Sequence, residues 1–202
     1  MKPILVVLLV VASLAMVTCS KVNNDSIAQN KSTAAKPVAE VSKQATAANF
    51  SLSFNEGLEK ASLEKKNMIV DFYTDWCHWC KVMDEKTFHD STVANKLQQR
   101  FITVRINAES PTDTVNFQGH RFTNIELTQA FRVTGFPSLA FISPDKEVIT
   151  VIPGYIPAEP FNYLLDYIDQ ECYKKQMSFE EFMKRKGDCN SDSAAPKSTT
   201  KS

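Results

Sequence analysis

Apolar and polar positions divide the chain into a central segment and two outer ones. Residues 4–17 are apolar except for Ser13, whereas 20–48 and 189–202 are rich in Ser, Thr, Lys, Asn and Ala and keep no apolar period. Such polar stretches are typical of a flexible tether and a disordered tail. The pattern predicts one folded domain over residues 49–188, an ordinary domain size.

Within the central segment, predicted helices and strands alternate. Continuous apolar runs, typical of strands buried on both faces, lie at 68–73, 101–106 and 138–142, and 147–152 is expected to return as a hairpin partner. Apolar residues at helical spacing occupy six stretches: 54–66 (closed by Asn67), 77–88, 90–97, 124–131 (capped by Asn124), 161–172 and 178–187. Residues 109–123 are predicted to be a loop. The pattern therefore predicts an α/β fold, with a mixed central β-sheet, helices on both faces and a C-terminal helical extension.

Composition narrows the classes of function. The chain has 23 basic and 23 acidic side chains, so it lacks the basic footprint of a nucleic-acid binder. Its five glycines do not cluster, and neither a phosphate-binding loop nor a dinucleotide fingerprint is present in the sequence. We expect no nucleic-acid partner and no bound cofactor.

Residues 1–19 resemble an export signal. Lys2 precedes the apolar run, which is shorter than the roughly 20 residues of a membrane-spanning helix, although an uncleaved anchor is the alternative. The run leads to Cys19, and a cleavage site that ends at a cysteine resembles a bacterial lipoprotein signal. Lipidation of Cys19 would then anchor an exported, periplasmic or cell-envelope domain to a membrane through residues 20–48.

The candidate chemistry lies where the first predicted strand meets a helix. Cys77 and Cys80 are separated by two residues. At the start of a helix, free N–H groups and the helix dipole lower the pKa of the first thiol, and the second cysteine, one turn later, can close a disulfide with it. His78 can add positive charge, and Trp76 and Trp79 would offer apolar surface to a partner polypeptide.

Two other interpretations of the cysteine pair stay open. It could be half of a zinc site, which needs a second pair of ligands, but His89, His120, Cys172 and Cys189 do not have paired ligand spacing. It could also be a purely structural disulfide. That interpretation does not explain Asp71, an acid inside an otherwise apolar strand.

Asp71 is expected to be buried behind the cysteines. Burial raises the pKa of a carboxyl group, so this one could take or give the proton that moves when the disulfide opens. Arg105, on the neighbouring predicted strand, could pair with the carboxylate at the same time.

Residues 70–81 resemble the active-site segment of the thioredoxin superfamily. Gly135-Phe136-Pro137 is similar to the cis-proline loop of that family, and Gly154 is similar to the glycine after its last strand. The similarity covers about residues 50–170. It extends to exported thioredoxin-like proteins and to the C-terminal domain of the DsbD family of transmembrane reductant carriers, which share the Thr-Phe-x-Asp stretch found here at 87–90.

The resemblance implies a thioredoxin fold and a protein thiol–disulfide oxidoreductase. Cys77 would attack a partner disulfide, Cys80 would resolve the mixed disulfide, and Asp71 would accept a proton. Pro137 would be cis and lie opposite the cysteines, and the backbone of Phe136 would pair with a substrate strand. Disulfide-bonded proteins and a transmembrane electron donor would be the partners.

The sequence departs from thioredoxin at three places that bear on the redox potential and the choice of partner. His78-Trp79 stands where thioredoxin has Gly-Pro, Glu85 replaces a helix-kinking proline, and the predicted loop 109–123 is longer than in the minimal fold. We expect a reductant. A disulfide isomerase, an oxidant, and a binding module for a metal or a protein without turnover are the alternatives.

Cys172 and Cys189 flank the terminal helical hairpin. In an oxidising compartment they could form a structural disulfide; the alternative is a buried free thiol at Cys172. The odd total of five cysteines would then be accounted for by lipidation of Cys19, by disulfide exchange at Cys77 and Cys80, and by a disulfide between Cys172 and Cys189.

Overall fold

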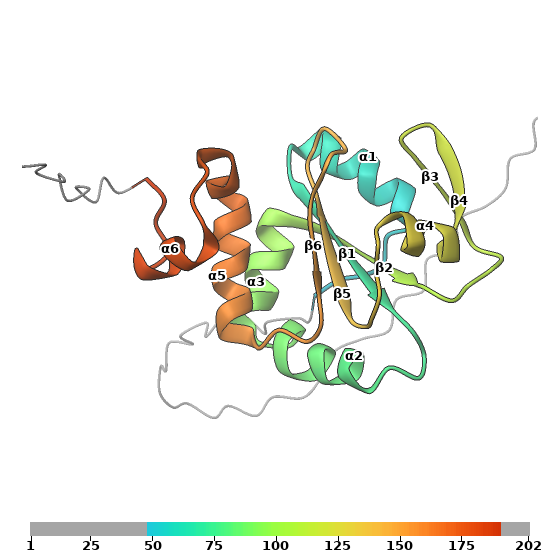
Figure 1. The fold of residues 1–202 in the computed structure, drawn as a ribbon, viewed down its shortest axis with the longest axis horizontal. Coiled ribbons are helices and arrows are strands. Elements are labelled where there is room, and N and C mark those ends of the chain that lie inside the picture. The colour runs from blue at the N-terminus through green and yellow to red at the C-terminus, as the bar shows by residue number, and fades with distance from the viewer. Residues whose placement is uncertain (1–47, 191–202) are drawn as a thin grey trace, which may run out of the picture. The chain divides into compact units, whose positions relative to one another are not determined.

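The computed structural model describes residues 48–190, so the predicted signal, most of the predicted tether and tail, and Cys19 lie outside it. A four-stranded sheet has the order β2-β1-β5-β6 (Figure 1). Its strands are Asn67–Tyr73 (β1), Phe101–Asn107 (β2), Ser138–Ile142 (β5) and Val148–Pro153 (β6). β1 runs parallel to β2 and antiparallel to β5, and β6 is antiparallel to β5. The predicted mixed sheet is confirmed.

Side chains of the strands alternate between the two faces of this sheet. The buried side chains form two core clusters, one on each face of the sheet. From β1, the first cluster contains Met68, Val70 and Phe72, and the second contains Ile69. Because side chains alternate along a strand, Asp71 lies on the same face as Ile69. The first face is covered by α1 (Phe54–Glu64) and α4 (Asn124–Ala130), and the second by α2 (His78–Met83), α3 (Ser91–Arg100) and α5 (Ala158–Asp169).

Helix α1 lies close against the sheet because of Gly57. A Cβ atom at this position would stand 2.4 Å from Val104 Cγ1 and 2.8 Å from Met68 Sδ, so any larger residue would push the helix away. The helix ends at Lys65, which takes a left-handed conformation with φ 56°. The prediction that Asn67 closes it is wrong, because Asn67 already pairs with Phe101 in the sheet.

The predicted helix over 77–88 forms in two parts. Helix α2 runs to Met83, and a π-helical turn, η1 (Asp84–Phe88), continues it. A π turn widens the helix locally and changes the direction of the side chains that it carries. Asp84 and Thr87, both in this turn, make contacts at the site described below.

The prediction of a loop over 109–123 is wrong in its second half. Residues Thr114–Phe117 (β3) and His120–Thr123 (β4) form a two-stranded antiparallel sheet. Gln118 and Gly119 both have positive φ, as a tight two-residue hairpin turn requires. Thr123, with Glu126, makes a capping box, so Thr123 and not Asn124 is the N-cap of α4.

The C-terminal extension consists of a 3₁₀ turn, η2 (Cys172–Lys175), and helix α6 (Phe179–Lys184), capped by Ser178. The apolar stripe predicted to reach Cys172 is interrupted, because Glu171 has φ 53° and ends the α5 path. A disulfide joins Cys172 to Cys189, and both sulfur-bearing residues are buried beside Phe182. No helix within residues 48–190 has the length and apolarity needed to cross a membrane.

We predict that the Cys172–Cys189 bond stabilises the oxidised protein. Replacing both residues by alanine should lower the free energy of unfolding by about 3 kcal/mol, because the crosslink restricts the unfolded chain, and denaturant unfolding without reductant measures this loss. The pair Cys77→Ala/Cys80→Ala, which opens a shorter loop, should lose less. Alkylation of Cys172 in unfolded, unreduced protein, detected by mass spectrometry, would contradict the bond.

Candidate active site

Cys77 and Cys80 form a disulfide at the start of α2, with their Cα atoms 5.3 Å apart. Cys77 is the N-cap residue, and its Sγ accepts a hydrogen bond from the N–H of Cys80 at 3.0 Å. The two residues are only 3% and 4% exposed. The sulfur of Cys77 therefore lies where free N–H groups and the helix dipole stabilise negative charge once the disulfide is opened.

Two tryptophans flank this disulfide and are open to solvent. Trp76 is 68% exposed and Trp79 is 54% exposed. The indole N–H of Trp76 donates to Glu109 Oε2 at 2.9 Å, and the ring of Trp79 stacks on Tyr155 with centroids 5.5 Å apart. His78 lies edge-on to Trp79 at 5.6 Å. The rings are thus held in place while their outer faces stay available to a partner.

The loop before β5 contributes to the same rim. The peptide bond between Phe136 and Pro137 is cis, and the ring of Phe136 meets Trp76 edge-on at 6.1 Å. The carbonyl of Pro137 accepts a hydrogen bond of 2.7 Å from the N–H of Gly154, which has φ 90°. This bond joins the proline loop to the segment that carries Tyr155, so three separate segments meet through Trp76 and Trp79. We call this set, Trp76, Trp79, Phe136, Pro137 and Tyr155, the aromatic rim.

Asp71 is buried in the centre of the sheet, at 1% exposure. Its Oδ2 accepts from Arg105 Nε at 2.8 Å and lies 2.6 Å from Arg105 Nη2, while its Oδ1 has no hydrogen-bond partner among the described residues. Asp71 and Arg105 are register partners on the parallel strands β1 and β2. The salt bridge anticipated from the sequence is therefore present.

Arg105 is shared between two carboxylates. Its guanidinium also donates to both carboxylate oxygens of Asp84, in the π turn that follows α2. The same guanidinium lies over the rings of Phe50 and Tyr73, 4.7 Å and 5.1 Å from their centroids. Arg105 thus connects the buried acid to the helix that carries the disulfide.

Burial raises the pKa of Asp71 to about 6, even though the positive charge of Arg105 acts in the opposite direction. Desolvation is the larger effect, and the nearby negative charge of Asp84 raises the pKa further. A carboxyl group with a pKa near neutrality can both accept and release a proton under physiological conditions.

Sequence reasoning missed three residues of this site. Asp84 lies four positions after Cys80, a spacing that puts two residues on one helix face, and that spacing was an available signal. Tyr155 follows Gly154, but nothing in the sequence pairs it with Trp79. Glu109 comes from the stretch predicted as loop. No group of three or more His, Cys, Asp or Glu side chains within residues 48–190 is arranged to hold a metal ion.

Known proteins resemble the chain over most of the residues that the structure describes. A model of the thioredoxin-like domain family matches residues 54–169. The chain is 31% identical over 128 residues to the thiol:disulfide interchange protein DsbD of Vibrio cholerae, covering 61% of this chain and 19% of that protein. It is 29% identical over 119 residues to DsbD of Campylobacter jejuni, covering 58% and 19%. The matched region is thus about a fifth of the length of these relatives.

Solved structures show the same fold at low sequence identity. A thioredoxin-fold protein from Helicobacter pylori superposes with a TM-score of 0.51 at 19% identity, covering 60% of this chain and 80% of that one. A DsbH oxidoreductase superposes with a TM-score of 0.50 at 20% identity, covering 71% and 95%. The fold class predicted from the sequence, a thioredoxin fold with a C-terminal helical extension, is confirmed.

We predict that the charge of Asp71 destabilises the oxidised protein above pH 6. The folded-state pKa of about 6 lies above the ordinary value of 3.8, so the stabilising effect of the proton is complete below pH 3.8 and is lost as the pH rises through 6. When the pH rises from 4 to 7.5, the unfolding free energy of Asp71→Asn should therefore increase by about 2.5 kcal/mol relative to that of wild type, as measured by urea denaturation.

Asp84→Asn is the matched control for this pH dependence. It removes the carboxylate that raises the pKa of Asp71, so the pH at which wild type loses stability should move downward while the titration itself remains. An equal stability difference between wild type and Asp71→Asn at both pH values would show that Asp71 does not titrate as described.

Proposed function

Because the chain belongs to the thioredoxin-like domain family, we propose that it is a cell-envelope thiol–disulfide oxidoreductase that exchanges disulfides with protein partners. The observation that carries the proposal is the Cys77–Cys80 disulfide at the start of α2, with Cys77 Sγ as acceptor of a helix N–H. At this position free N–H groups and the helix dipole would stabilise the Cys77 thiolate that forms when the disulfide opens.

The proposed reaction moves two electrons in two displacement steps. The Cys77 thiolate attacks one sulfur of the partner disulfide, whose S–S bond breaks, and the departing partner thiolate takes up a proton. A mixed disulfide between Cys77 and the partner results. The thiol of Cys80 then loses its proton and attacks Cys77 Sγ, which releases the second partner thiol and restores the Cys77–Cys80 disulfide.

Asp71 is the proposed acceptor of the Cys80 proton. Its carboxyl is buried on the sheet face that α2 covers, and its pKa of about 6 allows it to be ionised before the transfer and protonated after it. Arg105 and Asp84 act as positioning residues, because they hold this carboxyl between β1 and the π turn.

The aromatic rim is the proposed docking surface for the partner. Exposed Trp76 and Trp79 offer flat apolar area with a polar edge, a type of residue enriched where proteins bind one another. His78 stands between them in the chain. The backbone at Phe136, ahead of cis-Pro137, would pair with an extended strand of the substrate.

We propose that the chain acts as a reductant. When ionised, the buried Asp71 carboxylate disfavours a nearby thiolate and so disfavours the reduced form, which opposes the stabilising effect of the helix start on the Cys77 thiolate; strong oxidants, in contrast, have a stabilised reduced form. A reductant in an oxidising compartment needs two electrons for every partner that it reduces, and we propose a transmembrane electron donor as their source. The signal-like residues 1–19 and the Cys172–Cys189 bond support a location in the envelope, where we propose that lipidation of Cys19 anchors the domain.

The insulin reduction assay with dithiothreitol tests the exchange chemistry. Wild type should accelerate precipitation of the insulin B chain, and Cys77→Ser should reduce the rate to that of dithiothreitol alone because the nucleophile is lost. Cys80→Ser should accumulate a mixed disulfide with a partner that non-reducing electrophoresis detects. Equal rates for wild type and Cys77→Ser would refute the proposal.

The reduction potential tests the direction. Equilibration with glutathione should give a potential well below that of the oxidant DsbA, about −120 mV, and in the range of thioredoxin, about −270 mV. Asp71→Asn should raise the potential, because it removes a negative charge next to the reduced cysteines. A wild-type value near −120 mV would reverse the proposed direction and favour an oxidant or isomerase.

A further inference from the structure

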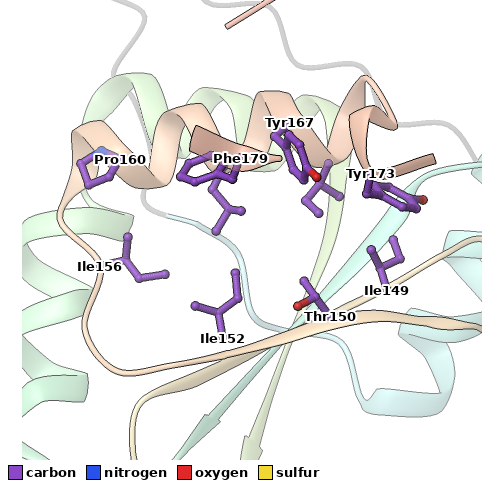
Figure 2. A pocket seen from close by; sticks show the side chains of 10 residues that line it. Ile149, Thr150, Ile152, Ile156, Pro160, Tyr167, Tyr173 and Phe179 are labelled. Atoms are coloured by element: carbon purple, nitrogen blue, oxygen red, sulfur yellow. The ribbon is translucent and has the colours of Figure 1, made fainter. Parts of the chain in front are cut away.

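A groove of about 490 Å³ lies between β6 and helix α5, outside the aromatic rim. Figure 2 shows Ile149, Thr150 and Ile152 on the strand side and Phe179 with Tyr173 on the opposite side, next to α5. Every lining residue except Thr150 is aliphatic or aromatic. The volume and the apolar lining are those of a site that buries a ligand side chain.

The C-terminal extension builds one wall of this groove. Tyr173 and Phe179 lie after residue 169, where the match to the thioredoxin-like domain family ends. The extension is held by the Cys172–Cys189 bond and by a small cluster around Phe182. The wall is therefore fixed in place before any ligand arrives, which lowers the cost of binding.

The opposite wall is the edge of the sheet. β6 is the last strand in the order β2-β1-β5-β6, so within residues 48–190 no further strand covers it. An irregularity in the pairing of β6 with β5, between Phe141 and Ile142, lets the neighbours Ile149 and Thr150 both line the groove. The groove is thus open to an incoming chain along this edge.

The groove and the aromatic rim meet at two adjacent residues. Tyr155, which stacks on Trp79, is followed by Ile156, which lines the end of the groove. Thr87 Oγ1, in the π turn after α2, donates to the carbonyl of Ile156 at 2.6 Å and holds this corner against the helix of the disulfide. A polypeptide that crosses Trp79 can therefore continue along apolar surface into the groove.

We propose that this groove binds a bulky apolar side chain of the same extended polypeptide whose disulfide reacts with Cys77. The inference rests on the proposed function and names its substrate class: unfolded or partly folded proteins that expose a large apolar residue at a set distance from the cysteine. Folded partners bury such residues and would not use the groove. Burial of one leucine or phenylalanine side chain can change affinity by roughly tenfold to a hundredfold.

Kinetics with synthetic peptides test this proposal. Disulfide-linked peptides would carry one phenylalanine in a glycine–serine background, at successive positions on either side of the cysteine. The full chain should show KM about tenfold lower at one or two neighbouring positions and unchanged kcat. A KM that is the same for every position of the phenylalanine would overturn the proposal. This experiment uses the wild-type protein alone, so it does not depend on the folding of a variant.

Thr150→Glu places a carboxylate between the apolar walls and should remove the tenfold preference. Val148→Glu is the matched control: it adds the same charge to the same strand, at a residue that is 42% exposed and does not line the groove. In the reduced form, wild type and both variants should reduce 5,5′-dithiobis(2-nitrobenzoic acid), a small disulfide without a polypeptide chain, at equal rates. Equal loss of preference in both variants would overturn the assignment of the groove.

Direct binding separates this proposal from the proposed function. A cysteine-free, fluorescein-labelled peptide with one phenylalanine should bind the Cys77→Ser/Cys80→Ser chain about tenfold more tightly than it binds the same chain with Thr150→Glu added, even if exchange activity were absent. Sedimentation tests whether a second copy of the chain, instead of a substrate, occupies the groove. A wild-type dimer that Thr150→Glu dissociates, with peptide binding unchanged, would assign the groove to a second copy of the chain and overturn the proposal.

Discussion

The buried salt bridge between Asp71 and Arg105 is the interaction on which the arrangement of the site depends. An ionised carboxylate at the centre of a sheet is costly unless a positive partner meets it, and Arg105 does so because β1 and β2 are parallel and in register. The same guanidinium reaches Asp84 in the π turn after α2. Sheet, buried acid and disulfide-bearing helix are thereby joined through one side chain, and the pKa of Asp71 remains near neutrality.

Around this centre, contacts between distant segments define what a partner can touch. The hydrogen bond from Gly154 to Pro137, the stacking of Tyr155 on Trp79 and the bond from Thr87 to Ile156 connect the proline loop, the segment after β6 and the helix of the disulfide. None of these contacts contributes to the chemistry of sulfur. Together they hold exposed apolar surface, on Trp76 and Trp79, next in the chain to two nearly buried cysteines.

The C-terminal extension adds surface to a family fold without altering its centre. Its disulfide and its small cluster around Phe182 stabilise a segment that is too short to form a core of its own. Its Tyr173 and Phe179 line the groove together with residues of β6 and α5. We therefore regard the extension as the part of the molecule in which selectivity for partners can differ from that of other thioredoxin-like domains.

The sequence alone determined the mixed α/β fold, the cysteine pair at a helix start and the buried acid, because each depends on local periodicity or on spacing within one strand–helix junction. Local pattern failed at the β3–β4 hairpin, whose alternation covers only four residues in each strand, and at the α1 end, where Lys65 adopts a left-handed conformation. Only the tertiary structure decided that Asp84 shares Arg105, that Tyr155 stacks on Trp79 and that the extension leaves a groove above β6. These contacts join residues far apart in the chain, and their geometry follows from the packing of whole elements, which no single stretch of sequence records.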